Sequence, residues 1–221
     1  MNSDTGADFQ ATIENGEIAV FPTDTLYGIS CDPDNAEAVE RIHELKGRPP
    51  KKPSAVMYFS LEHLLADIGD DLDVATLNLV EQLFPGPFTL VVANRGNRFL
   101  PACAGTPEKL GLRVPKLGRA IEPLGTVQVP VMQTSANISG APDATAIEDI
   151  DPAILAGVDL VIDGGPLLGY GSTVADVSGL EHGNWQLLRA PMPRTSARIS
   201  ELIGFPPQPE DQAVSPVNVQ P

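Results

Sequence analysis

The sequence has few of the residues that build metal sites, disulfide frameworks or thiol-based active sites. Its 221 residues include only 2 Cys and 3 His. Cys31 and Cys103 lie far apart with no metal-type spacing, and His43, His63 and His182 form no ligand cluster with them. We therefore expect no disulfide framework, no metal site built from protein side chains, and a reducing compartment.

Long apolar runs are also lacking. No stretch is long enough to span a bilayer, and the N-terminus has no hydrophobic segment of the signal-peptide kind. The hydrophobic content of 42% and the charged content of 19% are those of an ordinary globular protein. We expect a soluble cytoplasmic protein with one substantial core, folded as one α/β domain or two small ones.

Basic residues are scarce, with 14 Lys and Arg against 29 Asp and Glu and a formal net charge of -15. This balance argues against a general nucleic-acid binder, because any affinity for phosphate has to come from one local patch. The sequence also contains no P-loop, no Rossmann glycine fingerprint and no convincing Ser-His-Asp or Cys-His combination. A protein nucleophile is therefore not expected.

The one dense group of cations is the segment Lys46 to Pro53, which holds Lys46, Arg48, Lys51 and Lys52. One interpretation is a solvated loop whose charge keeps the chain soluble. The other is a polyphosphate clamp, in which lysines supply point charges and the arginine supplies a planar fork of donors. The prolines stiffen the loop and favour pre-positioned charges. Cations at this place also gain from the dipole of the preceding predicted helix.

The hydrophobic pattern predicts alternating helices and strands over residues 7–204. Helices are predicted over residues 7–15, 34–45, 71–84 and 195–203, and strands over 17–21, 54–59, 88–93, 110–114, 129–134, 158–162, 174–177 and 185–188. Residues 22–28 are expected to be a hydroxyl-rich turn, and residues 95–108 to be irregular. Residues 1–6 are expected to be a loose terminus and residues 205–221 a disordered tail.

Polar residues at strand ends are the candidate ligand groups. The turn over residues 22–28 and the segment 135–140 both follow buried strands, where α/β sheets bind ligands, although local turn chemistry is the alternative. The segment 169–173 is either an anion-binding nest or an ordinary turn. Arg113 lies inside an apolar strand and needs a partner. That partner is either a structural carboxylate or a carboxylate or phosphate of a ligand.

Seven short motifs occur in a fixed order along the chain. They are Phe21-Pro-Thr-Asp-Thr-Leu-Tyr-Gly28, Lys46-Gly-Arg48-Pro with Lys52-Pro53, Pro85-Gly-Pro-Phe-Thr-Leu90, Leu112-Arg113-Val-Pro115, Ser135-Ala-Asn137-Ile-Ser-Gly140, Ser172-Thr173-Val174 and Leu188-Arg189. Over residues 7 to about 203 this set resembles the YrdC-type threonylcarbamoyl-AMP synthase family in its single-domain form. The resemblance implies a twisted mixed α/β sheet, flanked by helices, with a concave and positively charged ligand face.

The resemblance also implies a reaction. L-Threonine, bicarbonate and ATP, the last with Mg²⁺, give threonylcarbamoyl-AMP and pyrophosphate in a nucleotidyltransferase reaction. The product serves tRNA threonylcarbamoyladenosine modification beside the anticodon, so that tRNA and the downstream threonylcarbamoyl-transfer proteins are possible partners. Such chemistry depends on positioning and charge neutralisation more than on a protein nucleophile. Two alternatives stay open: a non-catalytic RNA-binding module and a carbamoyl-transfer module of the same fold.

Site residues follow from matching the motifs position by position. The resemblance implies a catalytic role for Lys46 and Arg48. It implies ATP contacts for Arg48, Lys52, Lys109, Ser135, Asn137, Asp143 and Arg189, and threonine contacts for Thr25, Arg113, Gln133 and Ser172. The chain departs from the family pattern at Met57, where relatives often carry His near threonine, at Ser54 in place of Leu, and at Ala190 in place of Gly.

Overall fold

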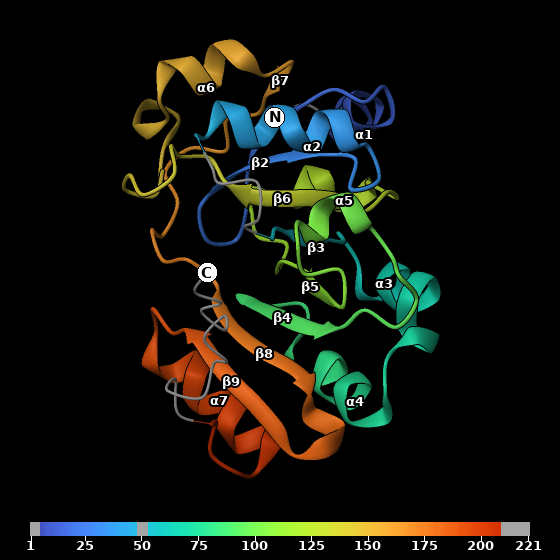
Figure 1. The fold of residues 1–221 in the computed structure, drawn as a ribbon. Coiled ribbons are helices and arrows are strands. Elements are labelled where there is room, and N and C mark those ends of the chain that lie inside the picture. Colours follow the sequence, from blue (N-terminus) through green and yellow to red (C-terminus); the bar gives the residue numbers. More distant parts are fainter. Residues whose placement is uncertain (1–4, 48–52, 209–221) are drawn as a thin grey trace, which may run out of the picture.

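The computed structural model describes residues 5–47 and 53–208 and has a mixed α/β fold (Figure 1). The helices are α1 (Thr5–Glu14), α2 (Ala36–Leu45), α3 (Leu61–Ile68), α4 (Val74–Leu83), α5 (Leu100–Cys103), α6 (Pro152–Gly157) and α7 (Pro193–Ile203). The strands are β1 (Ala19–Pro22), β2 (Tyr27–Cys31), β3 (Ala55–Met57), β4 (Phe88–Ala93), β5 (Lys109–Arg113), β6 (Val131–Ser135), β7 (Leu160–Val161), β8 (Thr173–Gly179) and β9 (Asn184–Arg189). In these two ranges no helix has the length and apolar character needed to cross a membrane.

The described strands form one mixed sheet in the order β7-β1-β2-β6-β3-β5-β4-β8-β9. The pairs β1–β7, β3–β5 and β4–β8 are parallel, and the other neighbours are antiparallel. In Figure 1, β8 and β9 at the bottom cross the direction of β2 and β6 in the upper half, which shows the twist of the sheet. The predicted twisted mixed sheet with flanking helices is therefore confirmed.

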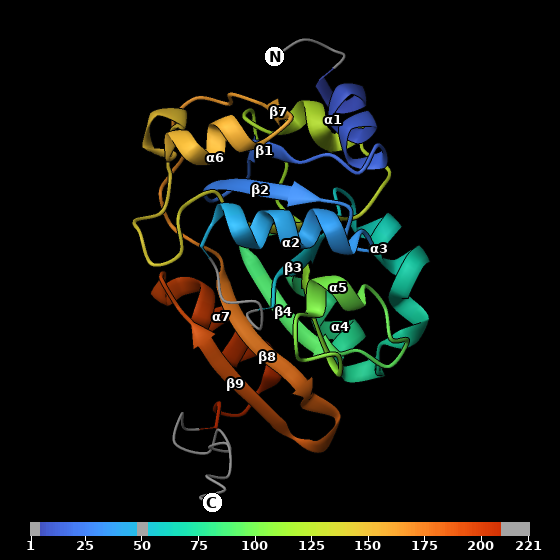
Figure 2. The same ribbon diagram turned by 45° about the horizontal axis from the view of Figure 1, so that its top comes forward.

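Helices α1 and α2 pack on opposite faces of β1. Val20 belongs to the larger apolar cluster, which also contains Ile42 of α2. Ala19 and Phe21 point the other way, because side chains alternate along a strand, and they join a smaller cluster with Phe9 of α1. The rings of Phe9 and Phe21 lie 5.0 Å apart. Figure 2 shows α2 lying across β2, close to the middle of the sheet.

Strand β2 is not predicted by the sequence, which indicates a turn over residues 22–28. The turn in the structure is shorter than the predicted one, because Tyr27 of β2 already pairs with Pro22 of β1. All five residues of β2 are buried, so the strand lacks the alternation of polar and apolar residues that marks a half-buried strand. Its Gly28 allows β6 to approach, since a Cβ there would lie 2.8 Å from Nε2 of Gln133. The strand that precedes α2 is thus β2 rather than β1.

Local capping decides several helix boundaries that the apolar pattern does not predict. Helix α4 begins at Val74 instead of residue 71, because the Asp73 carboxylate accepts the backbone N–H of Thr76 at 2.9 Å. Helix α3 was not predicted, and its N-cap Ser60 accepts the N–H of His63 at 3.1 Å. Helix α6 was not predicted either, and α5 lies within residues 95–108, which were expected to be irregular.

Both predicted ends of the folded region need correction. Helix α1 starts at Thr5, so residues 5 and 6 belong to it and not to a loose terminus. Residues 205–208 pack along β9: Nε1 of Trp185 donates to the carbonyl of Phe205 at 3.1 Å, and the N–H of Gln208 donates to the carbonyl of Trp185 at 2.9 Å. The expected disordered tail therefore does not begin at residue 205. Residues 1–4 and 209–221 lie outside the described ranges.

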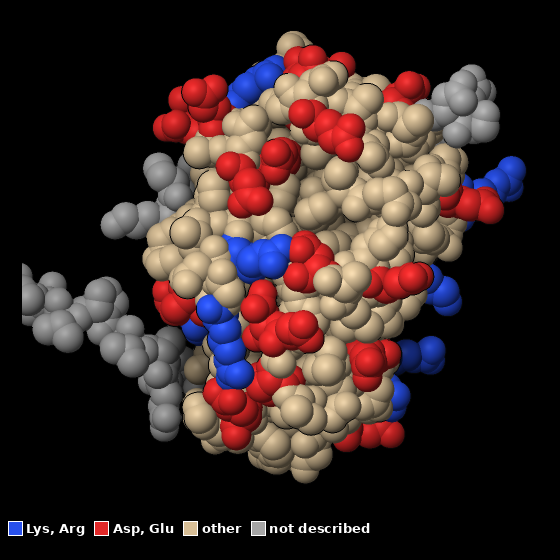
Figure 3. Space-filling model, turned by 90° about the vertical axis from the view of Figure 1, so that its right-hand side faces the viewer, with Lys and Arg blue, Asp and Glu red and all other residues tan. Residues whose placement is uncertain are grey.

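The flank of the molecule that carries α3 and α4 is rich in acidic groups. Figure 3 shows Asp and Glu spread over this surface, with basic groups mostly beside acidic ones. Arg95 pairs with Glu181 at 2.5 Å, and Arg98 pairs with Asp67. Because these cations are already neutralised by carboxylates, this flank is a poor surface for phosphate groups.

Candidate ligand cavity on the open face of the sheet

A cavity of about 580 Å³ lies on the sheet face opposite α2. Its floor is a row of paired residues that crosses five strands, namely Asp176, Val91, Gly111, Ala55 and Gln133. The centre of this row carries a glycine and an alanine. Small side chains there leave space above the sheet, whereas larger side chains stand at both ends of the row.

Seven of the predicted ligand residues line this cavity. They are Thr25, Lys109, Arg113, Gln133, Ser135, Ser172 and Arg189. They come from the β1–β2 turn, from β5, β6 and β9, and from the connection before β8. Three of them are cations, and the part of the lining that the structure describes contains one carboxylate, that of Asp176. The wider prediction of a concave, positively charged face stays a prediction.

Arg113 is the most enclosed of the three cations, with a side chain only 5% exposed. Its Nη2 donates to the Asp24 carboxylate at 2.5 Å, to the Thr25 hydroxyl at 2.6 Å and to the Thr23 hydroxyl at 3.2 Å. Its Nη1 lies 3.5 Å from Oε1 of Gln133, and its Nε has no hydrogen-bond partner within residues 5–47 and 53–208. Of the two partners expected from the sequence, a structural carboxylate is present in the form of Asp24.

The β1–β2 turn holds Thr25 in place through Thr23. The Thr23 hydroxyl donates to the carbonyl of Leu26 at 2.7 Å and accepts the N–H groups of Thr25 and Leu26, each at 3.2 Å. This local pattern leaves the Thr25 hydroxyl beside Arg113. The sequence left open whether the hydroxyls of this turn stabilise the backbone or contact a ligand. In the structure the Thr23 hydroxyl stabilises the turn, and Thr25 lines the cavity.

Ser172, Thr89 and Arg189 form a second polar group on the cavity wall. The hydroxyls of Ser172 and Thr89 lie 2.8 Å apart, and Arg189 donates to the carbonyl and the hydroxyl of Ser172, each at 3.0 Å. Partial burial lowers the pKa of Arg189, the charge of Asp143 opposes this shift, and the charge of Arg113 adds to it. The guanidinium groups of Arg113 and Arg189 both line the cavity, and their combined positive charge favours an anionic ligand there.

Lys109 and Asp176 form a third group, at the end of the floor on β5 and β8. The ammonium of Lys109 lies 2.6 Å from the Asp176 carboxylate. Burial alone would raise the pKa of Asp176, but hydrogen bonds from Lys109 and Ser178 bring it below its ordinary value. The carboxylate therefore stays charged and keeps the ammonium at the cavity wall.

Lys46 faces the protein interior and does not line the cavity. Its side chain is buried, and its ammonium donates to the carbonyl of Ser135, to the carbonyl of Asn137 at 2.6 Å and to Oδ1 of Asn137 at 3.3 Å. The Asn137 amide also donates to the carbonyl of Ala141 at 2.6 Å. Lys46 and Asn137 thereby fix the turn after β6 that presents Ser135 to the cavity. The predicted catalytic role of Lys46 stays a prediction.

Several other predicted residues lie elsewhere. Arg48 and Lys52 fall outside the described residues. Asp143 is exposed and does not line the cavity, although its charge acts on Arg189. Met57 is fully buried in the smaller apolar cluster, and it is also absent from the cavity lining. Ser54, in contrast, does line the cavity.

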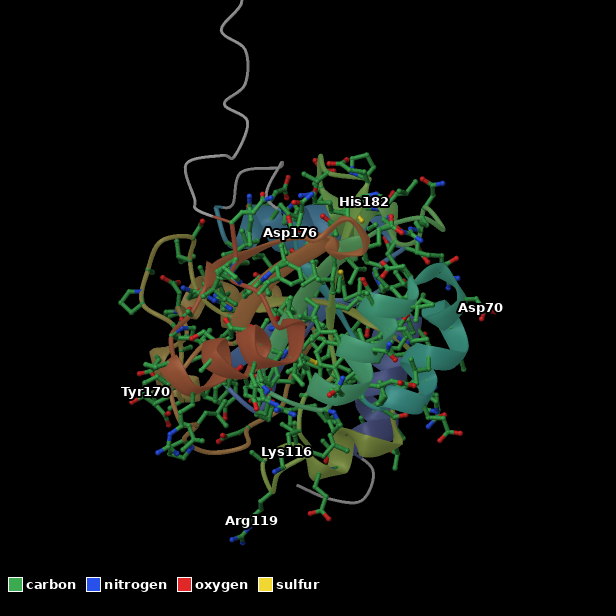
Figure 4. All side chains as sticks on the ribbon, turned by 90° about the horizontal axis from the view of Figure 1, so that it is seen from below. Asp70, Lys116, Arg119, Tyr170, Asp176 and His182 are labelled. Atoms are coloured by element: carbon green, nitrogen blue, oxygen red, sulfur yellow. The ribbon has the colours of Figure 1, made fainter. Side chains whose placement is uncertain are left out.

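Sequence reasoning assigned no role to several polar residues at or beside the cavity, among them Asp24, Thr89 and Asp176. Asp24 and Thr89 stand inside motifs that were recognised, but their side chains were assigned no role. Asp176 is two residues beyond Val174, so strand alternation from that residue places it on the same face as the cavity. Figure 4 shows Asp176 on the body of the protein, whereas Lys116, Arg119 and Tyr170 project at its edge.

The connection between β7 and β8 brings Ser172 to the cavity. The Tyr27 hydroxyl donates to Asp163 at 3.0 Å and to the carbonyl of Gly165 at 2.9 Å. The N–H of Leu167 donates to the carbonyl of Thr145 at 2.8 Å. These bonds fix the path of the connection across the sheet edge. Within the described residues, no group of three or more His, Cys, Asp or Glu side chains is placed to hold a metal ion.

Comparison with known proteins identifies the family. The model of the Sua5/YciO/YrdC family, which carries the description "telomere recombination", matches residues 11–190. The chain belongs to the Sua5/YciO/YrdC family. It is 34% identical over 158 residues to the threonylcarbamoyl-AMP synthase of Xanthomonas axonopodis pv. citri, covering 70% of this chain and 82% of the relative. The family resemblance inferred from the seven motifs is therefore confirmed.

Longer members of the Sua5/YciO/YrdC family match almost the whole chain. The threonylcarbamoyl-AMP synthase of Bacillus subtilis is 28% identical over 212 residues, which cover 96% of this chain but 59% of the relative. The crystal structure of Pyrococcus abyssi Sua5 complexed with L-threonine has a TM-score of 0.79 at 28% identity and covers 94% of this chain and 59% of that one. The chain thus spans little more than half the length of these two relatives.

Proposed function

We propose that this chain makes threonylcarbamoyl-AMP and pyrophosphate from L-threonine, bicarbonate and ATP, with ATP taken as its Mg²⁺ complex. The observation that carries the proposal is that seven residues assigned to ligands by the family resemblance, distant in the sequence, line one cavity. Similarity to the Sua5 protein that was solved with L-threonine supports the choice of amino acid. The reaction belongs to the nucleotidyltransferase class, and its product would be passed to tRNA-modifying proteins.

The proposed chemistry has two steps. The threonine amine attacks the carbon of bicarbonate, and loss of water gives a carbamate. A carbamate oxygen then attacks the α-phosphorus of ATP, the bond to the bridging oxygen of the β-phosphate breaks, and pyrophosphate leaves. Neither step needs a protein nucleophile, since both depend on bringing the reactants together and on balancing negative charge.

The cavity residues fit these needs in two groups. Arg113, with Thr25 and Gln133, forms the side suited to the carboxylate and hydroxyl of threonine, because a guanidinium pairs well with a carboxylate. Lys109 and Arg189 supply positive charge for the phosphates on the other wall. We further propose that Lys46 acts by shaping the turn that presents Ser135, and that Arg48 and Lys52 contact ATP, as the family resemblance implies.

The test is product formation by the purified full chain with ATP, Mg²⁺, L-threonine and bicarbonate. We expect threonylcarbamoyl-AMP by mass spectrometry together with pyrophosphate, and neither threonylcarbamoyl-AMP nor threonine-dependent pyrophosphate when L-threonine or bicarbonate is omitted. Formation of the same products without L-threonine and without bicarbonate would refute the proposal. Arg189→Met should lower kcat/KM for ATP about 10-fold or more, through loss of a charge-assisted contact. Arg198→Met is the matched control, because Arg198 is an exposed arginine that pairs with Glu201 on α7 and does not line the cavity.

A further inference from the structure

Asp24 is a motif residue that the sequence comparison leaves without a role, although its carboxylate pairs with Arg113 of the cavity lining. Its side chain is only 9% exposed, and it is not among the residues that line the cavity. Both of its oxygens are used: Oδ1 accepts from Nη2 of Arg113 at 2.5 Å, and Oδ2 accepts the backbone N–H of Lys116 at 3.0 Å. Asp24 therefore joins the β1–β2 turn to β5 and to the loop that follows it.

The hydrogen bonds divide the Arg113 guanidinium into two sides. Nη2 is held by Asp24, Thr25 and Thr23, which are three acceptors for two hydrogens. Among the described residues, Nη1 has only the long contact of 3.5 Å with Gln133, a residue of the cavity lining. The donors with spare capacity are thus on the side of the guanidinium that Asp24 does not hold.

We propose that Asp24 is a positioning residue for the amino-acid substrate, which fixes Arg113 so that its Nη1 edge receives the carboxylate of threonine. This inference rests on the proposed function. Asp24 acts through Arg113 and does not itself contact the ligand. An alternative role, in which Asp24 occupies the carboxylate position until threonine displaces it, fits less well, because Oδ2 is anchored to the backbone of Lys116.

Charge explains why Arg113 needs such a partner. Arg189 lines the same cavity, and the two guanidinium groups repel each other. A buried cation whose partner is removed is strongly destabilised. With Asp24 in place, the Arg113 guanidinium is held in position before any ligand arrives, so less ordering remains to be done when the substrate binds.

The sharpest perturbation is Asp24→Asn. Both Asp24 oxygens accept from N–H donors, but asparagine has one acceptor oxygen and an NH₂ group that is itself a donor. The variant must lose either the bond to Arg113 or the bond to Lys116. A hydrogen bond between charged groups contributes about 1.5–3 kcal/mol, so the affinity for L-threonine should fall roughly 10- to 150-fold if most of that contribution is lost.

The matched control is Asp159→Asn. Asp159 also combines an arginine and a backbone N–H: it accepts from Arg41 at 3.0 Å and from the N–H of Ile18 at 2.9 Å. It lies at the β7 edge of the sheet and does not line the cavity. The same chemical change is thereby made at a pair with no proposed link to substrate. We expect the affinity of this variant for L-threonine to equal that of wild type.

The measurement is calorimetric titration of the full chain with L-threonine and with L-threoninamide, which lacks the carboxylate. Asp24→Asn should weaken L-threonine binding by the stated factor while changing L-threoninamide binding less than about threefold. Equal weakening of both ligands, or L-threonine binding that is unchanged or tighter, would overturn the proposal. Failure of the wild-type chain to bind L-threonine would instead count against the proposed function.

Asp24→Glu keeps the inference testable if Asp24→Asn does not fold. Glutamate preserves the charge and both acceptor oxygens, but its extra methylene shifts the guanidinium of Arg113. We expect a smaller loss of L-threonine affinity, again without a change for L-threoninamide. A variant that folds and binds both ligands as wild type does would refute the positioning role.

Discussion

Replacing Lys46 by methionine would separate a structural role from a direct part in the chemistry. The Lys46 side chain is 2% exposed, and its ammonium donates to the carbonyls of Ser135 and Asn137. Its own carbonyl accepts the N–H of Ser139 at 2.8 Å, so that the backbone binds the same turn. Methionine fills nearly the same volume but donates no hydrogen bond. The perturbation is therefore confined to the ammonium.

The size of the effect follows from the acceptors left behind. Each buried carbonyl that loses its donor costs about 1–3 kcal/mol, so two carbonyls lower the free energy of unfolding by roughly 2–6 kcal/mol. For a chain of this size, about 1 kcal/mol corresponds to a change of about 2–4 °C in Tm. We expect Lys46→Met to lower Tm by at least about 4 °C. We also expect weaker ATP binding, because the turn that presents Ser135 is no longer held.

The assay is thermal unfolding followed by circular dichroism, with ATP titration of the same samples below Tm. Lys116→Met is the control, since Lys116 is exposed and lies outside the cavity lining. Its Tm and ATP affinity should match those of wild type. If Lys46→Met keeps the wild-type Tm while activity is abolished, the ammonium acts on the reactants and the structural interpretation is wrong.

Two further predictions concern the cavity floor. The bonds that lower the pKa of Asp176 stabilise the folded chain above the carboxyl's unfolded value of about 3.9, and this contribution is lost as the pH falls through the folded pKa. Asp176→Asn should therefore lower Tm at pH 7, with a difference that shrinks as the pH is lowered past about 3.9, and a constant difference across a pH series of melts would contradict this. Gly111→Val should place a branched side chain on the cavity floor. We expect calorimetry to show a lower affinity for ATP while the circular dichroism spectrum stays native. An unchanged affinity would show that ATP does not bind over this floor.

The sequence alone determined the α/β class, most of the strands and the family. Periodicity is strong where an element has one buried side, as in α2, whose Val39 and Ile42 lie on one stripe. It fails for β2, where every residue is buried. Helix α3 does carry an apolar stripe, at Leu61, Leu64, Leu65 and Ile68, and its omission from the prediction was an error in interpreting the pattern. An alternating or striped pattern of polar and apolar residues arises only when one side of a strand or helix faces solvent. A strand that is buried on both faces therefore lacks this pattern.

The members of the site could also be named from the sequence, because ordered motifs identify residues one by one. Thr25, Arg113, Gln133 and Ser172 were predicted as a group, and they do line one cavity. The motifs could not show which group pairs with each charged side chain. Arg113 needed a carboxylate or phosphate on energetic grounds, but its sequence position does not say whether protein or ligand provides it.

Only the tertiary structure decided those pairings. The pairing of β3 with β5 and β6 aligns Ala55, Gly111 and Gln133 in one row and so creates the cavity floor. The β1–β2 turn places Asp24 against Arg113, which is 89 residues away in the chain. Helix α2 ends with Lys46 turned toward the carbonyls after β6 instead of toward the cavity. The physical reason is that desolvation and hydrogen-bond satisfaction depend on distances in space, which sheet register sets and local sequence does not record.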